Sequence, residues 1–333
     1  MRRAAHLIVV LVTCACGGKS TAPPVAPIVP ATVSERMLAM LPQGAQVVVE
    51  IDLARLRANP VVGVVVTRAL AEGTAELPAG LPASPLASAA QVVLAAYGVG
   101  TAQAATLTVL AAPTELPGTT KLADGFYAVG PPEWVEQAQQ RVALATTGEA
   151  TFAISAAPEL LELRRRAMPA NAPGASLRIT ARLPFDARIA LARQTGLDAA
   201  PAQLSAWGDV MDDLALIVDC DAADPGNHSS DPRRAADAPR RLEASLRGAL
   251  AAVSEEPLMR MLGLPSSLAN ARLTSHGTWV RAIIAVGPTH LRRVVERATA
   301  LLGAAKPVAP ASDAAAPASP LLPAATPRGD APS

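Results

Sequence analysis

Proline-rich segments at both ends of the chain limit what can fold. Seven of the 28 residues from 306 to 333 are proline and nine are alanine, and no helix persists at that proline density. Four more prolines lie between residues 23 and 30, in a stretch without periodic apolar residues that is typical of an extended tether. We therefore expect a tether over 16–33 and a disordered tail over 304–333, with the folded region between them.

Within the folded region, strand-like and helix-like patterns alternate in two successive series. In the clearest strand, Leu177 and Ile179 face one way and Arg178 and Thr180 the other, which is the period of a half-buried strand. Amphipathic helices are expected between and after the strands. We expect strands over 47–51, 91–97, 106–112 and 125–129 in a first half (34–170), and over 177–182, 214–218, 271–275 and 279–286 in a second half (171–303).

The two halves end on the same four residues. Ala128-Val129-Gly130-Pro131 and Ala285-Val286-Gly287-Pro288 each close a strand just before a helix. This shared context favours a duplicated β-α-β-β-α unit, although four matching residues also arise by chance in an alanine-rich chain. The expected fold class is α+β, a largely antiparallel sheet with helices on one face.

The N-terminus has the parts of a secretory signal. Two arginines precede an apolar run over 7–12, which is too short to span a membrane because a spanning helix needs about 20 apolar residues. The pair Ala15-Cys16 resembles the lipobox of bacterial lipoproteins, in which cleavage leaves the cysteine as an acylated N-terminus. We expect a lipoprotein signal peptide over 1–15 and lipidation of Cys16. Cys14 is the second choice, and an ordinary cleaved signal peptide is the alternative.

Two further resemblances concern location. Gly17 beside the expected anchor resembles the outer-membrane sorting pattern of Gram-negative lipoproteins, which implies an envelope protein facing the periplasm or the cell surface. Leu41-Pro42, followed by 45–49 and 52–57, resembles the opening of uncharacterised lipoproteins from GC-rich myxobacteria and their relatives. This resemblance covers only the front of the chain and implies no activity.

Composition excludes several functions. The chain has 29 Lys plus Arg against 28 Asp plus Glu, which argues against a nucleic-acid partner. Only 2% of residues are aromatic, too few for a platform that stacks bases or sugars. Beside the expected anchor the mature chain keeps one cysteine, Cys220, so we expect no internal disulfide. In its apolar segment Cys220 is expected to be a small buried hydrophobe, with a reactive thiol as the alternative.

No recognisable catalytic motif occurs. The mature chain has three histidines, His228, His276 and His290, and none has the spacing of a zinc-binding pair. No serine lies in a nucleophile motif. We therefore expect no catalytic residue and no cofactor.

One acidic cluster offers a metal-binding alternative. Asp219, Asp221, Asp224 and Asp231 follow an apolar strand and surround His228; closely spaced oxygen ligands suit calcium. The spacing departs from the EF-hand order, and a solvated loop with Asx turns explains the same residues. A periplasmic metal-dependent hydrolase using this loop is the alternative function.

The basic run 164–166 also has two interpretations. At a helix end, arginines complement the helix dipole, whereas on a surface they bind anionic lipid headgroups. Taken together, these features predict a non-enzymatic, lipid-anchored envelope protein with a binding or scaffolding role. Its expected partners are the membrane, through the N-terminal lipid, and another envelope protein.

Overall fold

The structure is a computed structural model that describes residues 32–71, 83–146, 158–170, 172, 174–195, 197, 199–222 and 232–304. The expected signal peptide and Cys16 lie outside these ranges, as do the tether up to residue 31 and the tail from residue 305. None of the described helices is both long and apolar enough to cross a membrane.

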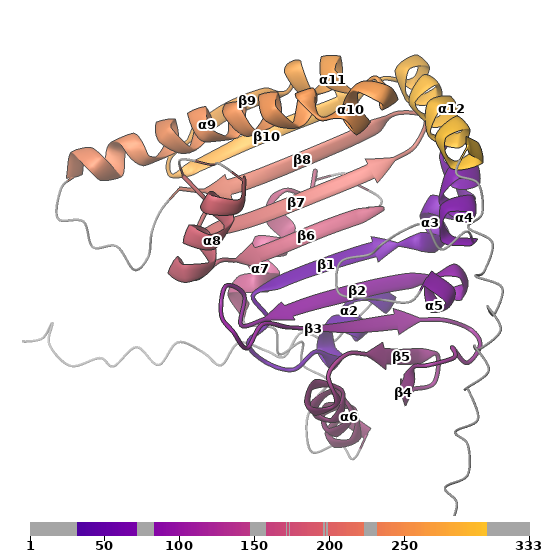
Figure 1. Ribbon diagram of the computed structural model, residues 1–333. Coiled ribbons are helices and arrows are strands. Elements are labelled where there is room, and N and C mark those ends of the chain that lie inside the picture. Colours follow the sequence, from indigo (N-terminus) through magenta and orange to yellow (C-terminus); the bar gives the residue numbers. More distant parts are fainter. Residues whose placement is uncertain are drawn as a thin grey trace, which may run out of the picture.

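A ten-stranded sheet runs through the described part of the chain (Figure 1). Its order is β4-β5-β3-β2-β1-β6-β7-β8-β10-β9, and every strand is antiparallel to its neighbours. The expected α+β class with an antiparallel sheet is confirmed. The strands are β1 (Val47–Asp52), β2 (Gln91–Tyr97), β3 (Ala105–Ala111), β4 (Thr120–Ala123), β5 (Phe126–Val129), β6 (Leu177–Arg182), β7 (Gln203–Val210), β8 (Leu214–Asp221), β9 (Arg272–His276) and β10 (Trp279–Val286).

Helices lie before, between and after these strands. Six of the described helices begin with proline, whose fixed φ suits the first helical turn, where its missing N–H costs nothing. The helices are α2 (Val33–Met40), α3 (Leu53–Ala58), α4 (Gly63–Ala71), α5 (Ala83–Ser88), α6 (Pro132–Thr146), α7 (Pro158–Arg166), α8 (Phe185–Thr195), α9 (Pro232–Glu255), α10 (Pro257–Leu262), α11 (Pro265–Ala269) and α12 (Pro288–Ala304).

The sheet consists of two topologically equivalent halves. Counting outward from its centre, the strands run β1-β2-β3-β5-β4 on one side and β6-β7-β8-β10-β9 on the other. In each half a helix precedes the first strand, at least one described helix separates the first two strands, and a helix follows the last strand. The second half also has α9, α10 and α11 between its third and fourth strands, where the described first half has no helix. From here on, the first half means α2 to α6 and the second half α7 to α12.

The repeat is larger than the sequence predicted. Each half contributes five strands, whereas the expected β-α-β-β-α unit has three. The sequence analysis missed β4 and β7. β4 has only four residues, too few to show a period. β7 reads Gln-Leu-Ser-Ala-Trp-Gly-Asp-Val, in which small and polar residues hide the alternation.

Helices cover both faces of the sheet, so the expectation of helices on one face is wrong. Val92 and Val93 are consecutive in β2 and therefore point to opposite faces. Val93 packs in a cluster with α2 and α6, whereas Val92 packs in a second cluster with residues of α3, α4 and α5. Both positions are buried because helices cover β2 on both faces.

We call these two surfaces the front face and the back face. The front face carries Val49, Ile179 and Leu216 and is turned toward the viewer in Figure 1. The back face carries Glu50, Arg178 and Asp219, and α2, α6 and α7 lie behind it.

Side-chain caps define the starts of the first helices. Thr32 and Glu35 form a capping box at the start of α2, in which each side chain binds the other's backbone N–H. Asp52, the last residue of β1, accepts a hydrogen bond from the backbone N–H of Arg55 at 2.8 Å and so begins α3 directly after the strand. These caps define where α2 and α3 begin, and packing against the sheet places α2 behind it.

Candidate binding site: an apolar hollow in the sheet

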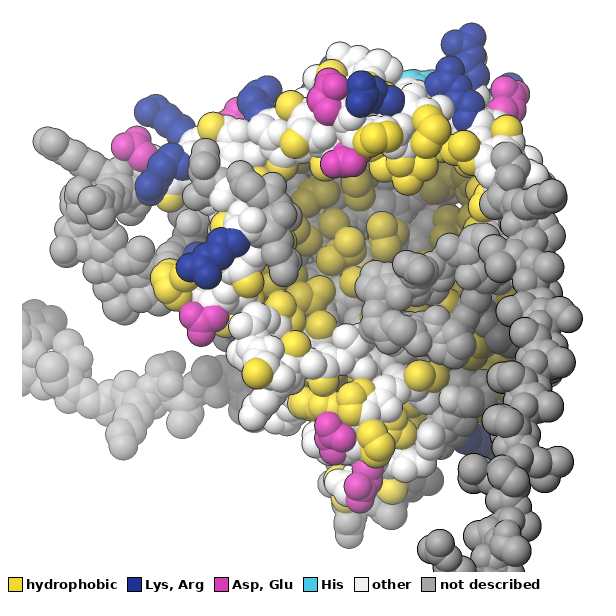
Figure 2. Space-filling model, in the orientation of Figure 1, with side chains coloured by type: hydrophobic (Ala, Val, Ile, Leu, Met, Phe, Trp, Pro, Cys, Tyr) yellow, Lys and Arg dark blue, Asp and Glu magenta, His cyan; other side chains and the backbone are white. Residues whose placement is uncertain are grey.

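The described residues leave the middle of the front face apolar and only partly covered. Figure 2 shows a hollow there, lined by hydrophobic side chains. Two rows of cross-strand neighbours form its floor over β1, β6, β7, β8 and β10. We call this surface the front hollow; its rows are Ile51–Leu177–Gly208–Leu216–Ile284 and Val49–Ile179–Ala206–Val218–Ala282.

The front hollow lies between two separate packing clusters. The first half packs α3, α4 and α5 over its own strands, and the second half packs α9 over β8 and β10 around Leu242. Val49, Ile179 and Leu216 belong to neither cluster and are partly exposed. Aliphatic side chains left open side by side on a sheet mark a binding surface more often than chance exposure.

Small residues on β7 form the lowest part of this floor. Ala206 and Gly208 occupy the positions where neighbouring strands carry isoleucine, leucine or valine. A Cβ at Gly208 would lie 3.4 Å from Leu216 Cδ1 and 3.6 Å from Leu177 Cβ. A methyl group therefore fits at Gly208, and any larger side chain there would project into the front hollow.

The floor carries no hydrogen-bonding side chain. Every residue in the two rows is a glycine or has a hydrocarbon side chain. Such a surface binds by removing apolar area from water, at about 25 cal/mol per Å², and it offers no general acid, base or nucleophile. The described floor therefore supports apolar binding.

Behind the front hollow, the back face carries ion pairs. Arg164 on α7 donates to both carboxylate oxygens of Glu50, at 2.7 and 2.9 Å. Burial disfavours the charged guanidinium, but the hydrogen bonds and charge of Glu50 outweigh burial and raise the pKa of Arg164. Arg166 stacks over Trp279, 3.7 Å from the ring centroid. The basic run at the end of α7 therefore has structural contacts at its first and third positions.

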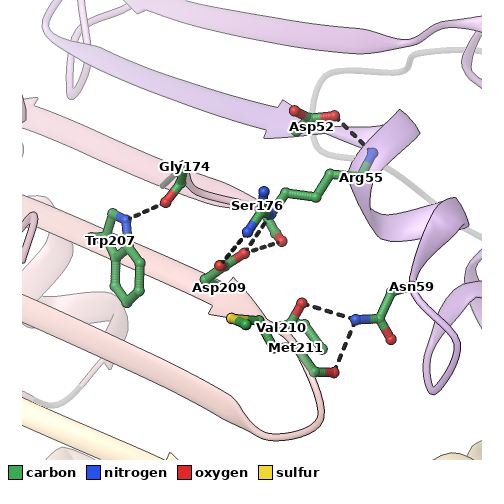
Figure 3. A network of polar contacts seen from close by, with 9 residues as sticks. All are labelled: Asp52, Arg55, Asn59, Gly174, Ser176, Trp207, Asp209, Val210 and Met211. Atoms are coloured by element: carbon green, nitrogen blue, oxygen red, sulfur yellow. Dashed lines mark hydrogen bonds and ion pairs between the residues drawn. The ribbon is translucent and has the colours of Figure 1, made fainter. Parts of the chain in front are cut away.

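A second polar network joins the two halves (Figure 3). Arg55 on α3 donates to both carboxylate oxygens of Asp209 on β7, at 2.8 and 2.6 Å, and Ser176 donates to the same carboxylate at 2.7 Å. Burial alone would raise the pKa of Asp209, but the hydrogen bonds from Arg55 and Ser176 outweigh it, and the pKa lies below its usual value. Asn59 donates to the carbonyls of Val210 and Met211. We call this network the seam; it holds α3 beside one end of the front hollow.

The expected metal-binding loop is described only in part. Asp224, His228 and Asp231 lie outside the described residues. Asp219 is 2% exposed, and both of its carboxylate oxygens accept hydrogen bonds from Arg281 at 2.8 Å. Asp221 is also buried. In the part of the chain that the structure describes, no three His, Cys, Asp or Glu side chains gather as a metal-binding group.

The remaining candidate residues have structural environments. His290 on α12 contacts the carbonyl of Gly263 at 2.6 Å and the hydroxyl of Ser267 at 3.3 Å. Cys220 is free and 1% exposed in the cluster around Leu242, which confirms its interpretation as a small buried hydrophobe. Burial, and to a lesser extent the nearby charge of Asp219, raises the pKa of the Cys220 thiol to about 12.

Sequence reasoning missed the front hollow. Its floor combines residues from strands far apart in the chain, and β7, which supplies the small residues, was not predicted as a strand. The one local signal is Leu214-Ala215-Leu216-Ile217-Val218, a run without alternation. Such a run indicates a strand that is apolar on both faces, but it does not reveal which face remains open.

Comparison with known proteins gives a weak structural likeness and no family. No protein-family description and no curated protein matches the chain. A solved structure described as crystal form I of TP0453 aligns with 81% of this chain and 99% of its own, at 9% identity and a TM-score of 0.38. Neither value supports an inference about function.

Proposed function

We propose that the protein is a lipid-anchored component of the cell envelope whose front hollow binds the acyl chain of a membrane lipid. The observation that carries the proposal is the open apolar floor between the two front-face clusters. An acyl chain buried there gains about 0.8 kcal/mol per methylene removed from water. This is a specific form of the binding role expected from the sequence.

The form of the floor favours an acyl chain over a peptide. The strands under the front hollow are paired on both sides, so they offer no free edge to which a peptide strand could add. The floor also has no hydrogen-bonding side chain to orient a peptide backbone. A hydrocarbon chain needs only apolar contact, and the aliphatic rows supply it.

The anchor expected at Cys16 supports the proposal by location. A multiply acylated cysteine holds a protein stably at a bilayer, and the tether over 16–33 gives the folded part reach from that surface. The lipids of the envelope are then the apolar ligands at highest local concentration. Cells fed radiolabelled palmitate should label the wild-type chain and not Cys16→Ala; label that persists in the variant would refute the anchor at this residue.

The test of the front hollow uses two adjacent isoleucines on β10. Ile284 lies on the front face in the floor, whereas Ile283 lies on the back face and is 37% exposed. Cells producing the full chain are fed a photoactivatable fatty acid and irradiated, and crosslinked peptides are mapped. We expect crosslinks over β6 to β8 in the wild type and in Ile283→Glu, and at least about tenfold fewer in Ile284→Glu, because a buried carboxylate there opposes apolar binding.

Each other outcome contradicts the proposal. Equal crosslinking of Ile284→Glu and Ile283→Glu would show that the probe binds elsewhere. Wild-type crosslinks confined to the region of Cys16 would show that the fatty acid enters only the anchor. A crosslinked envelope protein instead of lipid at β6 to β8 would replace the acyl chain by a protein partner.

A further inference from the structure

A second, chemically different cavity lies on the back face, where β1 ends. Its volume is about 190 Å³, and its polar lining comes from Ser34, Glu50, Asp52, Gln91 and Arg178, with the backbone of Gly174 nearby. Four of these residues are cross-strand neighbours, because Glu50 pairs with Arg178 and Asp52 pairs with Gln91. Three adjacent strands, β2, β1 and β6, therefore present polar groups to one small cavity.

The charges around this cavity are unevenly paired. Glu50 is neutralised by Arg164 and also accepts a hydrogen bond from Ser34. Among the described residues, its cross-strand neighbour Arg178 donates to the sulfur of Met168, at 3.3 Å. Asp52 accepts from the backbone N–H of Arg55 at 2.8 Å and from the amide of Gln91 at 3.3 Å. In the described structure the cavity wall thus holds one cation and one carboxylate that form no ion pair.

Two buried polar atoms in the same wall have no partner. They are Oε1 of Gln91, an acceptor, and Nε of Arg178, a donor. Buried polar atoms in native proteins are nearly always satisfied, so each orphan needs an explanation. Burial, followed by the like charge of Arg164, lowers the pKa of Arg178, while the charges of Glu50 and Glu35 act in the opposite direction. Both atoms are closed off from solvent, so a bound molecule reaches them only when the two side chains turn toward the cavity.

We propose that this cavity binds a small zwitterion of the amino-acid type. The carboxylate of the ligand binds the guanidinium of Arg178, whose planar set of N–H donors matches the geometry of a carboxylate. The ammonium of the ligand meets Asp52 and Oε1 of Gln91, both of which accept hydrogen bonds. The volume corresponds to about six water molecules at roughly 30 Å³ each, enough for the two charged groups and a small side chain. This site lies on the opposite face from the front hollow and does not depend on it.

Truncated analogues of one amino acid test the proposal. L-alanine carries both charged groups, propionate lacks the ammonium, and ethylamine lacks the carboxylate. Isothermal titration of the full-length protein in detergent should give alanine an affinity at least about tenfold above that of either analogue, since each lost charge-assisted hydrogen bond costs roughly 1.5 kcal/mol or more. Propionate equal to alanine would make the cavity a simple anion site, and ethylamine equal to alanine a simple cation site. No heat with any of the three would leave it a water-filled cavity. Each of these results overturns the proposal.

Variants assign the binding to this cavity. Arg178→Met and Gln91→Leu should each weaken alanine binding at least about tenfold. The matched control is Arg247→Met, which removes an arginine from α9 that pairs with Glu243 and should bind alanine as the wild type does. If Arg178→Met loses its native circular dichroism, Arg178→Lys keeps the charge without the planar set of N–H donors and should still weaken binding. Unchanged alanine binding in folded Arg178→Lys and Gln91→Leu would refute the site.

The two proposals fail independently. Ile284→Glu should lose acyl crosslinks and keep alanine binding, whereas Gln91→Leu should do the reverse. Loss of both activities in either variant would point to misfolding and is checked by circular dichroism.

Discussion

The two halves share one topology but use the faces of the sheet differently. In the first half helices cover both faces, with α2 and α6 behind and α3 to α5 in front. In the second half α7 lies behind, whereas in front α8 lies at one end of the strands and α9 covers the outer strands. The corresponding last helices differ most: α6 buries Val135, Ala138 and Val142 against the sheet, whereas α12 contacts α4 and α10.

Strand length accounts for part of this difference. Counted outward from the central β1–β6 pair, Thr108 on β3 is equivalent to Val218 on β8. β5 ends at Val129, which pairs with Thr108. On β10 the equivalent position is Ala282, which pairs with Val218, and the strand continues beyond it to Val286. The same Ala-Val-Gly-Pro junction therefore starts α12 farther along the sheet, where it meets the first half's α4 instead of its own strands. Longer strands leave the second half with apolar surface that its own helices do not cover.

The largest expected effect comes from replacing one leucine by alanine in each half. Leu107 is fully buried in the first half's back cluster, and Leu107→Ala should lower the free energy of unfolding by about 4 kcal/mol. Leu216 lies in the front hollow and is partly exposed, so Leu216→Ala should cost only about 1 kcal/mol. Urea denaturation followed by circular dichroism measures both. Equal losses would mean that the front hollow is packed as tightly as the core.

A glycine in the turn between β2 and β3 tests the contact between the halves. Gly100 has φ +83°, and a Cβ there would lie 2.7 Å from the Cα of Ala187 on α8. Gly100→Ala should therefore cost about 3 kcal/mol, from the left-handed backbone and from the clash with the second half. The matched control is Gly44, with φ +89° and nothing within 4 Å of a Cβ; Gly44→Ala should cost about 1 kcal/mol. Equal losses of thermal stability in the two variants would show that the clash with Ala187 does not contribute.

The ion pair at the seam tests the same contact by charge. Asp209 is 4% exposed and Arg55 is 31% exposed at their side chains. Asp209→Ala should cost about 2 kcal/mol, less than a fully buried pair because Arg55 can turn to water. A double-mutant cycle with Arg55→Ala should show a favourable coupling energy. Additive losses would mean that the two residues act separately.

Lowering the pH should weaken the ion pair between Arg55 and Asp209. The pKa of Asp209 is lowered in the folded protein, so the folded state binds this proton less readily than the unfolded chain. The carboxylate therefore stabilises the fold above the unfolded pKa of about 4, and the stabilisation is lost as pH falls below it. Between about pH 5 and 3, the wild type should lose roughly 1 kcal/mol more stability than Asp209→Asn. Parallel pH profiles of the two proteins would contradict this assignment.

The sequence predicted the fold class and most of the strands, because alternation and apolar runs act locally. The shared junction before α6 and α12 also indicated a duplication, although of a three-strand unit rather than of five strands. It could not predict the front hollow, since whether Leu216 is covered depends on where α9 and α12 pack rather than on neighbours in the chain. The cavity at Arg178 was missed for a similar reason. Arg178 alternates like an ordinary solvent-facing residue, and only the register opposite Glu50 and the position of α7 enclose it.

Cys220 gives the smallest and most local test of the difference between halves. It is the one cysteine in the described part of the chain, and it packs in a front cluster of only three fully buried residues. With a pKa raised to about 12 by burial, its thiol should resist iodoacetamide at neutral pH in the native protein. Because so small a cluster opens at lower free energy than the first half's core, labelling of Cys220 in rising urea should begin before the loss of circular dichroism. Peptide mapping identifies the labelled site. Labelling that begins only at global unfolding would show that the second half, although open at its front, unfolds together with the first.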